Sequence, residues 1–126
     1  MSYQTDRQRV SGLGSAKDGT HEWIGQRISA IALVPLVILF VLPLAINLGK
    51  DFETVRLAYG HPFNAIVGIL FFITVSMHLK HGLQEVIVDY IHGKKKLVLA
   101  LLANTAFSTI LGVTGVFSIA KIAFGG

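Results

Sequence analysis

The chain has 126 residues, of which 52% are hydrophobic and only 14% are charged, and its mean hydropathy is +0.64. A soluble domain carries about a quarter charged residues, so this composition favours a membrane protein. The absence of cysteine excludes disulfides, thiolate metal sites and cysteine nucleophiles. The net charge of +4 comes from basic side chains at the edges of apolar runs. Membrane topology explains such charges, and no nucleic-acid partner is expected.

Residues 1–20 are predicted to form a polar N-terminal arm, followed by a transmembrane domain at 21–126. The arm has too few apolar side chains to fold alone, so any order in it is expected to come from a partner. The first membrane helix is predicted at about residues 23–48. It starts near the interfacial Trp23, with Arg27 at the membrane edge. Pro35 and Pro43 lie inside this helix, and a kink is therefore expected.

The following segments alternate between short polar connections and long apolar runs. Residues 50–60 are expected to form a loop of mixed charge. The second helix is predicted at about 62–92, with Pro62 in its first turn and Gly93 after its end. A tight basic loop at 94–96 leads to the third helix, at about 97–122. This helix carries small residues on one face, a spacing that lets helices approach closely: Ser108, Gly112 and Gly115.

The predicted fold is an all-α membrane protein with three transmembrane helices, because each run is near the roughly 20 residues that span the hydrocarbon core. Orientation follows from the basic side chains. Three lie on the side of the first loop, namely Lys50, Arg56 and Lys121, and seven lie on the opposite side, namely Arg7, Arg9, Lys17, Arg27, Lys94, Lys95 and Lys96. The positive-inside rule then predicts a cytoplasmic N-terminus and a periplasmic C-terminus. The end of the second helix should lie near the cytoplasmic surface.

The second helix contains ionisable groups where charge is costly, about 2.5–3.5 kcal/mol for Lys, Arg or Asp at a helix centre. At about 100° per residue, Glu85, Asp89 and His92 return to within about 40° of His78, and His81 lies about 60° away. One face is therefore predicted to carry a stripe of titratable groups that descends to the cytoplasm. Lys80 is expected to point elsewhere and to snorkel. Tyr90 flanks the stripe at about 120° from His78.

Several interpretations of this stripe remain open from the residues alone. His78 can hydrogen-bond a neighbouring helix, serve as an axial haem ligand, or take part in a proton relay. His81 is the rival ligand, or a polar contact nearer the interface. Asp89 can be a solvated carboxylate at a helix end, and Tyr90 can belong to an aromatic belt. Arg27 can be a positive-inside anchor.

The chain resembles the hydrophobic membrane anchor subunits of bacterial haem b-containing succinate dehydrogenase, the succinate:quinone oxidoreductase of complex II. The resemblance rests on Gly12-Leu-Gly-Ser-Ala-Lys17, on the segment from Trp23 through Gln26-Arg27 to Pro35, and on His78-x3-Gly82 followed by Asp89-Tyr90. His21 does not align securely with the histidine that precedes this tryptophan in the family. The Gly-x-Arg-His run of the family's other anchor, the companion cytochrome b subunit, is absent.

The resemblance implies a role for individual residues. His78 would be one axial ligand of the haem b iron, and the companion cytochrome b anchor would supply the other histidine. Arg27 would pair with a haem propionate. Tyr90 would donate a hydrogen bond to a quinone carbonyl, and Asp89 would support this site or its proton delivery.

The resemblance also implies partners and a location in the bacterial inner membrane, with roles in electron transport and the tricarboxylic acid cycle. The three helices would pack with the companion anchor as one bundle, surrounded by membrane lipids. Electrons would arrive from the iron–sulfur subunit, which links the two anchors to the flavoprotein subunit. Succinate chemistry would take place in another chain, so this chain alone would catalyse nothing. Two alternatives stay open: a proton-conducting or transporter subunit, and a haem-free anchor of the fumarate-reductase type.

Overall fold

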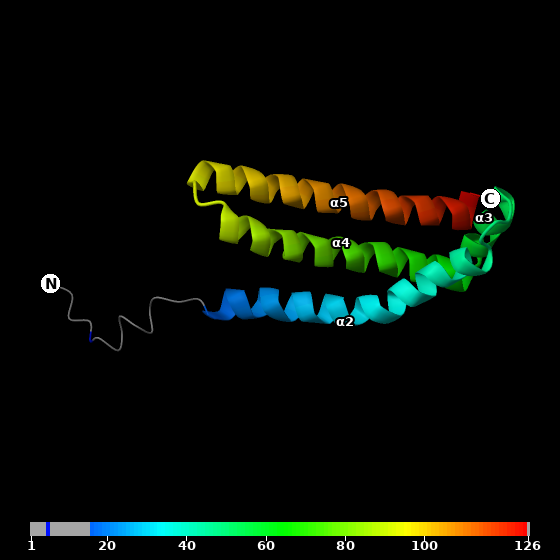
Figure 1. Cartoon of the computed structure of the whole chain (residues 1–126), viewed down its shortest axis with the longest axis horizontal. Coiled ribbons are helices and arrows are strands. Elements are labelled where there is room, and N and C mark those ends of the chain that lie inside the picture. Colours follow the sequence, from blue (N-terminus) through cyan, green and yellow to red (C-terminus); the bar gives the residue numbers. More distant parts are fainter. Residues whose placement is uncertain (1–4, 6–15, 126) are drawn as a thin grey trace.

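The computed structural model describes Thr5 and residues 16–125, with side chains from Thr20 onward in the second range. The described residues form four helices, α2 (Ala16–Ile46), α3 (Phe52–Gly60), α4 (Pro62–Tyr90) and α5 (Lys94–Gly125). Most of the predicted N-terminal arm lies outside the described residues. Three long helices run side by side, with α3 beside the end at which the C-terminus lies (Figure 1). Because α4 contacts both α2 and α5, it is the central helix of the three.

The three long helices confirm the predicted all-α fold with three candidate membrane spans. The apolar segments comprise 27, 29 and 32 residues, at Thr20–Ile46, Pro62–Tyr90 and Lys94–Gly125. At 1.5 Å per residue, each is longer than the hydrocarbon core, which is about 30 Å thick. The helix ends differ from the prediction. The first helix starts at Ala16, the second ends at Tyr90 with Ile91 extended, and the predicted basic loop is the first turn of α5.

The prediction of a loop at residues 50–60 is wrong, because most of this segment forms α3. Asp51 precedes the helix in an extended conformation and accepts a hydrogen bond from the Thr54 hydroxyl. One turn on, Glu53 and Arg56 form an ion pair at i,i+3 spacing, with 2.6 Å between Oε1 and Nη2. These local contacts support the helix, and the burial of Tyr59 in the core adds to them. Gly49, with φ of 82°, allows the chain to reverse before it.

An aromatic cluster joins α2, α3 and α4 at this end. The Tyr59 hydroxyl donates to the backbone carbonyl of Phe40 at 2.7 Å. Phe40 stacks on Phe71 with 4.3 Å between ring centroids, and Phe72 meets both rings edge-on. Figure 1 shows α2 bending through its cyan part, the half that contains two prolines, in agreement with the expected kink. The bend and the cluster together close this end of the bundle.

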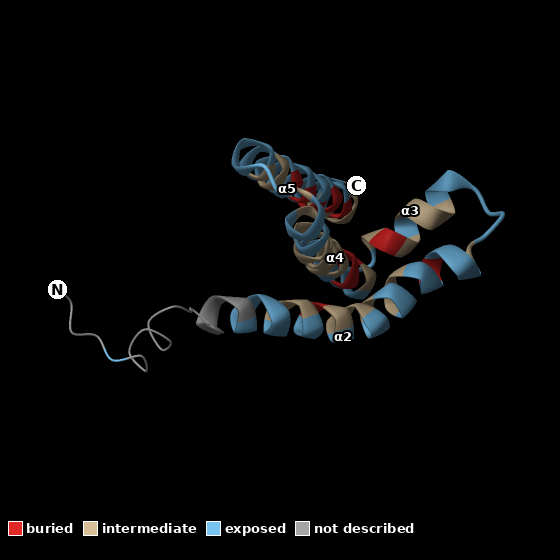
Figure 2. Ribbon diagram, turned by 60° about the vertical axis from the view of Figure 1, so that its left-hand side comes forward, coloured by how far each residue is buried: buried red, intermediate tan, exposed pale blue. Residues whose placement is uncertain are grey.

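Small residues on α5 pack against α4, as the sequence predicts. Ser108, Gly112 and Gly115 are buried. A Cβ atom added at Gly112 would lie 2.6 Å from Ser76 Oγ, and one added at Gly115 would overlap the Phe72 ring. These glycines therefore set the closest approach of the two helices. Elsewhere many large apolar residues are exposed, and exposed residues are pale blue on the ribbon of Figure 2. Such exposure suits lipid and partner helices.

Candidate functional site

The His78 side chain faces α2, where it meets Ser29. His78 Nδ1 lies 3.1 Å from Ser29 Oγ, and the Ser29 hydroxyl donates to the backbone carbonyl of Gln26 at 2.8 Å. Since a hydroxyl has one proton and it is directed at Gln26, the Ser29 oxygen is left to accept from an Nδ1–H group. This hydrogen bond holds the imidazole in the tautomer whose Nε2 keeps its lone pair. That is the form in which histidine binds a metal ion.

Two further layers of polar side chains lie between α2 and α4, and together with the first they make a polar seam. It consists of Glu22, Gln26 and Ser29 on α2 and of His78, His81 and Gln84 on α4. In the outermost layer, Gln84 Nε2 donates to Glu22 Oε1 at 3.0 Å. Successive layers are three or four residues apart on each helix, or about one helical turn. The seam therefore runs about two turns along the bundle, from His78 toward the end of α4 that carries Tyr90.

The middle layer contains His81 and Gln26, each packed against a glycine of the opposite helix. A Cβ atom at Gly25 would lie 3.3 Å from His81 Cε1, and one at Gly82 would lie 3.7 Å from Gln26 Nε2. His81 Nδ1 and Gln26 Oε1 are buried and have no hydrogen-bond partner among the described residues. Burying such a group unpaired costs about 1–3 kcal/mol. The sequence left two roles open for His81, a rival ligand and a polar contact nearer the interface. Its ring lies one layer outward from His78, and both roles stay predictions.

The predicted stripe on α4 is only partly continuous in the structure. Glu85 and Asp89 are exposed on the helix surface, whereas His78 is half-buried against α2. His92 lies beyond the end of α4, where Ile91 is extended, so the prediction that His92 continues the helical stripe is wrong. Asp89 and Glu85 are one turn apart on the helix that carries His78, and they are open to a neighbouring molecule.

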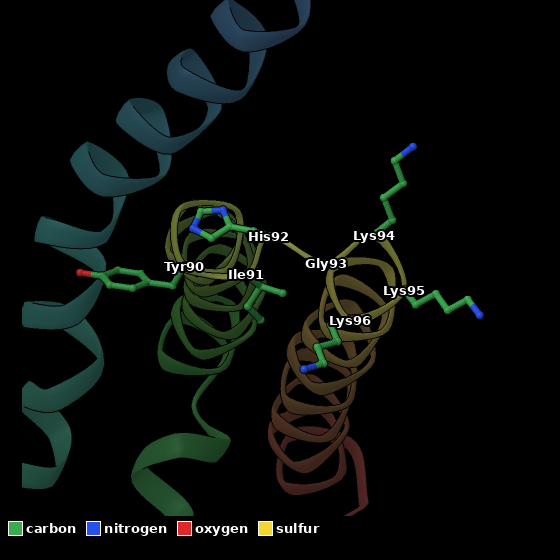
Figure 3. Close-up of a pocket in the computed structure, with 7 residues that line it drawn as sticks. All are labelled: Tyr90, Ile91, His92, Gly93, Lys94, Lys95 and Lys96. Carbon is green, nitrogen blue, oxygen red and sulfur yellow. The ribbon is translucent and has the colours of Figure 1, made fainter.

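Tyr90 is the last residue of α4, and its side chain is 80% exposed. A shallow cavity of about 580 Å³ is lined by the residues from Tyr90 to Lys96. Figure 3 shows that the Tyr90 phenol points away from His92 and from the three lysines. The phenol and the basic side chains therefore do not converge on one small molecule within this cavity. The hydroxyl of Tyr90 is open to a ligand or partner on its own side of α4.

Arg27 lies against Trp23, with its guanidinium carbon 4.9 Å from the ring centroid. Both side chains are exposed on α2, as is His21. Arg27 precedes Ser29 by two residues, so it is about 200° away on the helix and projects from the side opposite the polar seam. The structure therefore does not bring Arg27 and His78 together. The contact with Trp23 is a cation–π interaction of the kind found at membrane edges.

Polar residues on α2 and α5 are the site contacts that were not predicted from the sequence. Asn104 Nδ2 donates to the Lys80 backbone carbonyl at 2.8 Å, and Ser108 Oγ donates to Asn104 Oδ1 at 3.3 Å. Ser29 and Asn104 are each buried within an apolar helix. Their position inside apolar runs could have indicated these contacts, because polar groups at bilayer depth usually face another helix. Within the described part of the chain, no three His, Asp or Glu side chains gather as a metal site.

The sequence matches a known family of membrane proteins along most of its length. The profile of the family described as "Succinate dehydrogenase/Fumarate reductase transmembrane subunit" matches residues 1–112. The chain belongs to this family. Three relatives agree with the assignment to the succinate dehydrogenase anchors. The "succinate dehydrogenase hydrophobic membrane anchor subunit" of Paracoccus denitrificans is 32% identical over 99% of this chain and 96% of its own length.

Two further relatives carry similar names. The "succinate dehydrogenase hydrophobic membrane anchor subunit" of Rickettsia bellii is 31% identical over 86% of each chain. The "succinate dehydrogenase membrane anchor subunit" of Reclinomonas americana is 30% identical over 68% of this chain and 73% of its own length. No solved structure gives a significant match.

Family membership and the three spans confirm a multi-pass protein of the bacterial inner membrane. As a membrane anchor of succinate dehydrogenase, the chain associates with the membrane and with the other subunits of complex II.

Proposed function

We propose that this membrane anchor supplies one axial ligand of a haem b and part of a quinone-reduction site. The observation that carries the proposal is the contact between His78 Nδ1 and Ser29, because it leaves Nε2 available to iron. Haem b supplies one-electron chemistry when bound. The second axial histidine belongs to the companion cytochrome b anchor.

The exposed end of α4 supports the quinone part of the proposal. Tyr90 offers a neutral O–H donor that can stabilise negative charge developing on a quinone oxygen. Asp89, exposed beside it, is the proposed support of this site or of its proton delivery. Arg27 keeps a permanent positive charge at the membrane edge and is the proposed partner of a haem propionate. Stacking on the Trp23 ring leaves the N–H groups at the edge of the guanidinium available to a carboxylate.

The proposed arrangement defines what the partners contribute. The sequence has no cysteine with which to hold an iron–sulfur cluster, so electrons arrive from the iron–sulfur subunit, itself reduced by the flavoprotein subunit. The positive-inside count favours a cytoplasmic position for the N-terminus and for the Tyr90 end of α4, where the iron–sulfur subunit docks, and a periplasmic C-terminus. The three helices pack with the companion anchor as one bundle.

The haem part is tested by the optical spectrum of the purified complex with single histidine substitutions. His78→Ala should remove the reducible b-type Soret band, since it deletes an axial nitrogen. His81→Ala is the matched control, because it removes a second histidine one turn away and should retain the band. Loss of the band in His81→Ala and its survival in His78→Ala would reject His78 as the ligand. A complex without any such band would indicate a haem-free anchor.

The quinone part is tested separately with Tyr90→Phe. This substitution removes one hydroxyl from an exposed side chain, so assembly and the haem spectrum should stay unchanged. The rate of quinone reduction should fall about 10²–10³-fold if this donor stabilises the transition state as an oxyanion-hole donor does. Unchanged quinone kinetics would remove Tyr90 from the site without affecting the haem assignment.

A further inference from the structure

The first turn of α5 concentrates positive charge at a place where the helix itself disfavours it. Lys94, Lys95 and Lys96 are consecutive and exposed at the N-terminus of the helix. The N-terminal end of a helix carries partial positive charge, so cations there are unfavourable and an anion is favoured. The only ion pair within the described part of the chain is the one in α3. An anion from outside the chain would therefore stabilise this turn.

A shallow apolar groove continues directly from two of these lysines. It has a volume of about 410 Å³ and is lined by Lys94, Lys95, Val98, Leu99 and Leu102. Val98 and Leu99 follow the two lysines by four residues each, so they lie one turn below them on the same face. The apolar side chains are 57%, 69% and 62% exposed in chain order. Lys96 does not line this groove.

Charge and shape together define the occupant. The groove lies on a membrane-spanning helix, with cationic groups at the helix end and aliphatic side chains below them. Figure 3 shows Lys94 and Lys95 projecting from α5 on the side away from Tyr90. An anionic head group next to an acyl chain matches this order of charged and apolar surface. A soluble anion would leave the three aliphatic side chains uncovered.

We propose that this groove binds an anionic phospholipid, with its phosphate at Lys94 and Lys95 and an acyl chain along Val98, Leu99 and Leu102. None of these five residues is a proposed haem or quinone residue, although Lys94 and Lys95 also line the cavity next to Tyr90, from which their side chains point away. The lipid screens the lysines from one another and from the helix N-terminus. It also covers an apolar face of α5, and it anchors the turn between α4 and α5 at the membrane surface.

The test is native mass spectrometry of the intact purified complex, titrated with phosphatidylglycerol or with phosphatidylcholine of the same acyl chains. The wild-type complex should bind phosphatidylglycerol more tightly. Each lysine near the head group is worth about 5-fold in affinity, so Lys94→Gln/Lys95→Gln should weaken phosphatidylglycerol binding about 30-fold and leave phosphatidylcholine binding unchanged. The matched control is Lys96→Gln, which removes the same charge from the same turn but not from the groove.

Two further arms separate a lipid site from diffuse electrostatic attraction and from binding of free phosphate. Leu102→Asn should weaken binding of phosphatidylglycerol but not of glycerol phosphate, which has no acyl chain. Equal losses for Lys95→Gln and Lys96→Gln, with no effect of Leu102→Asn, would overturn the proposal. Tight binding of glycerol phosphate alone would also overturn it. Because the readout is lipid mass, loss of haem or quinone activity does not affect the result.

Discussion

Ser29→Ala is the most direct test of the environment that holds His78. The substitution removes the hydroxyl that accepts from His78 Nδ1 at 3.1 Å and changes little else in side-chain volume. An imidazole N–H left unpaired inside the bundle costs about 1–3 kcal/mol. Loss of a hydrogen-bond partner to a metal-ligating histidine typically lowers metal affinity about 10–100-fold, and the two figures agree because about 1.4 kcal/mol corresponds to tenfold. We therefore expect the Ser29→Ala complex to release haem about 10–100-fold faster.

The assay transfers haem from the purified complex to excess apomyoglobin and follows the Soret band with time. Ser29→Thr keeps the hydroxyl and should release haem at close to the wild-type rate. Ser118→Ala is the matched control on α5, because the Ser118 hydroxyl donates to a carbonyl of its own helix at 2.7 Å, as Ser29 does. If Ser29→Ala retains haem as firmly as wild type, the hydrogen bond does not orient the ligand. Equal destabilisation by Ser118→Ala would point to a general effect on folding.

Three other substitutions test the packing of α5 against α4 and the ion pair in α3. Gly115→Ala places a Cβ into the Phe72 ring, so overpacking should lower the unfolding free energy of the complex by about 1–3 kcal/mol. Thermal unfolding in detergent measures this change, and an unchanged midpoint would contradict the contact. Asn104→Leu removes the hydrogen bond from α5 to α4 and should cost about 0.6 kcal/mol by the same assay, whereas a gain in stability would show that the bond is unfavourable in lipid. The hydrogen bond from Arg56 lowers the pKa of Glu53 below its ordinary value of 4.5. The ion pair therefore stabilises α3 fully above pH 4.5. This stabilisation is lost as the pH falls through the lowered pKa of Glu53. Glu53→Gln should remove this part of the acid sensitivity in thermal unfolding at stepwise lower pH, and an unchanged pH profile would exclude the pair.

The length and polarity of the apolar runs were enough to predict the three spans. Each run exceeds the thickness of the hydrocarbon core, and no alternative structure satisfies so many backbone groups in lipid. The short helix α3 was missed for a local reason. The prediction was guided by the charges at Lys50, Asp51, Glu53 and Arg56, although most of the nine residues of α3 are apolar. Its support comes from two contacts at i,i+3 spacing, Asp51–Thr54 and Glu53–Arg56, and from Tyr59, which is buried in the core. The apolar residues Phe52, Val55 and Tyr59 stand at helical spacing, so the sequence did carry a signal for this helix.

The sequence predicted which candidate residues share a face of α4, but not which residues of α2 they contact. Helical geometry placed Glu85 and Asp89 on the face of His78, because angle along one helix depends only on sequence spacing. The contact between His78 and Ser29 depends on how α2 and α4 are aligned lengthwise, which a single sequence does not define. The packing of Gly25 against the His81 ring has the same origin. Sequence spacing therefore identified the candidate ligand, whereas the structure identified the group that orients it.

The two ends of this site differ in what a partner has to contribute. Around His78 the chain provides its own hydrogen bond through Ser29, and this contact needs no partner subunit. At the other end the Tyr90 phenol is 80% exposed, and Asp89 is exposed on the same helix. An exposed phenol stabilises a quinone oxygen weakly, because water competes for the same hydrogen bond and the surrounding dielectric constant is high. A partner that covers Tyr90 and excludes water would strengthen this interaction without moving the side chain. Under the proposed function, assembly would therefore change the surroundings of Tyr90 most, whereas the hydrogen bond at His78 is made by α2 and α4 alone.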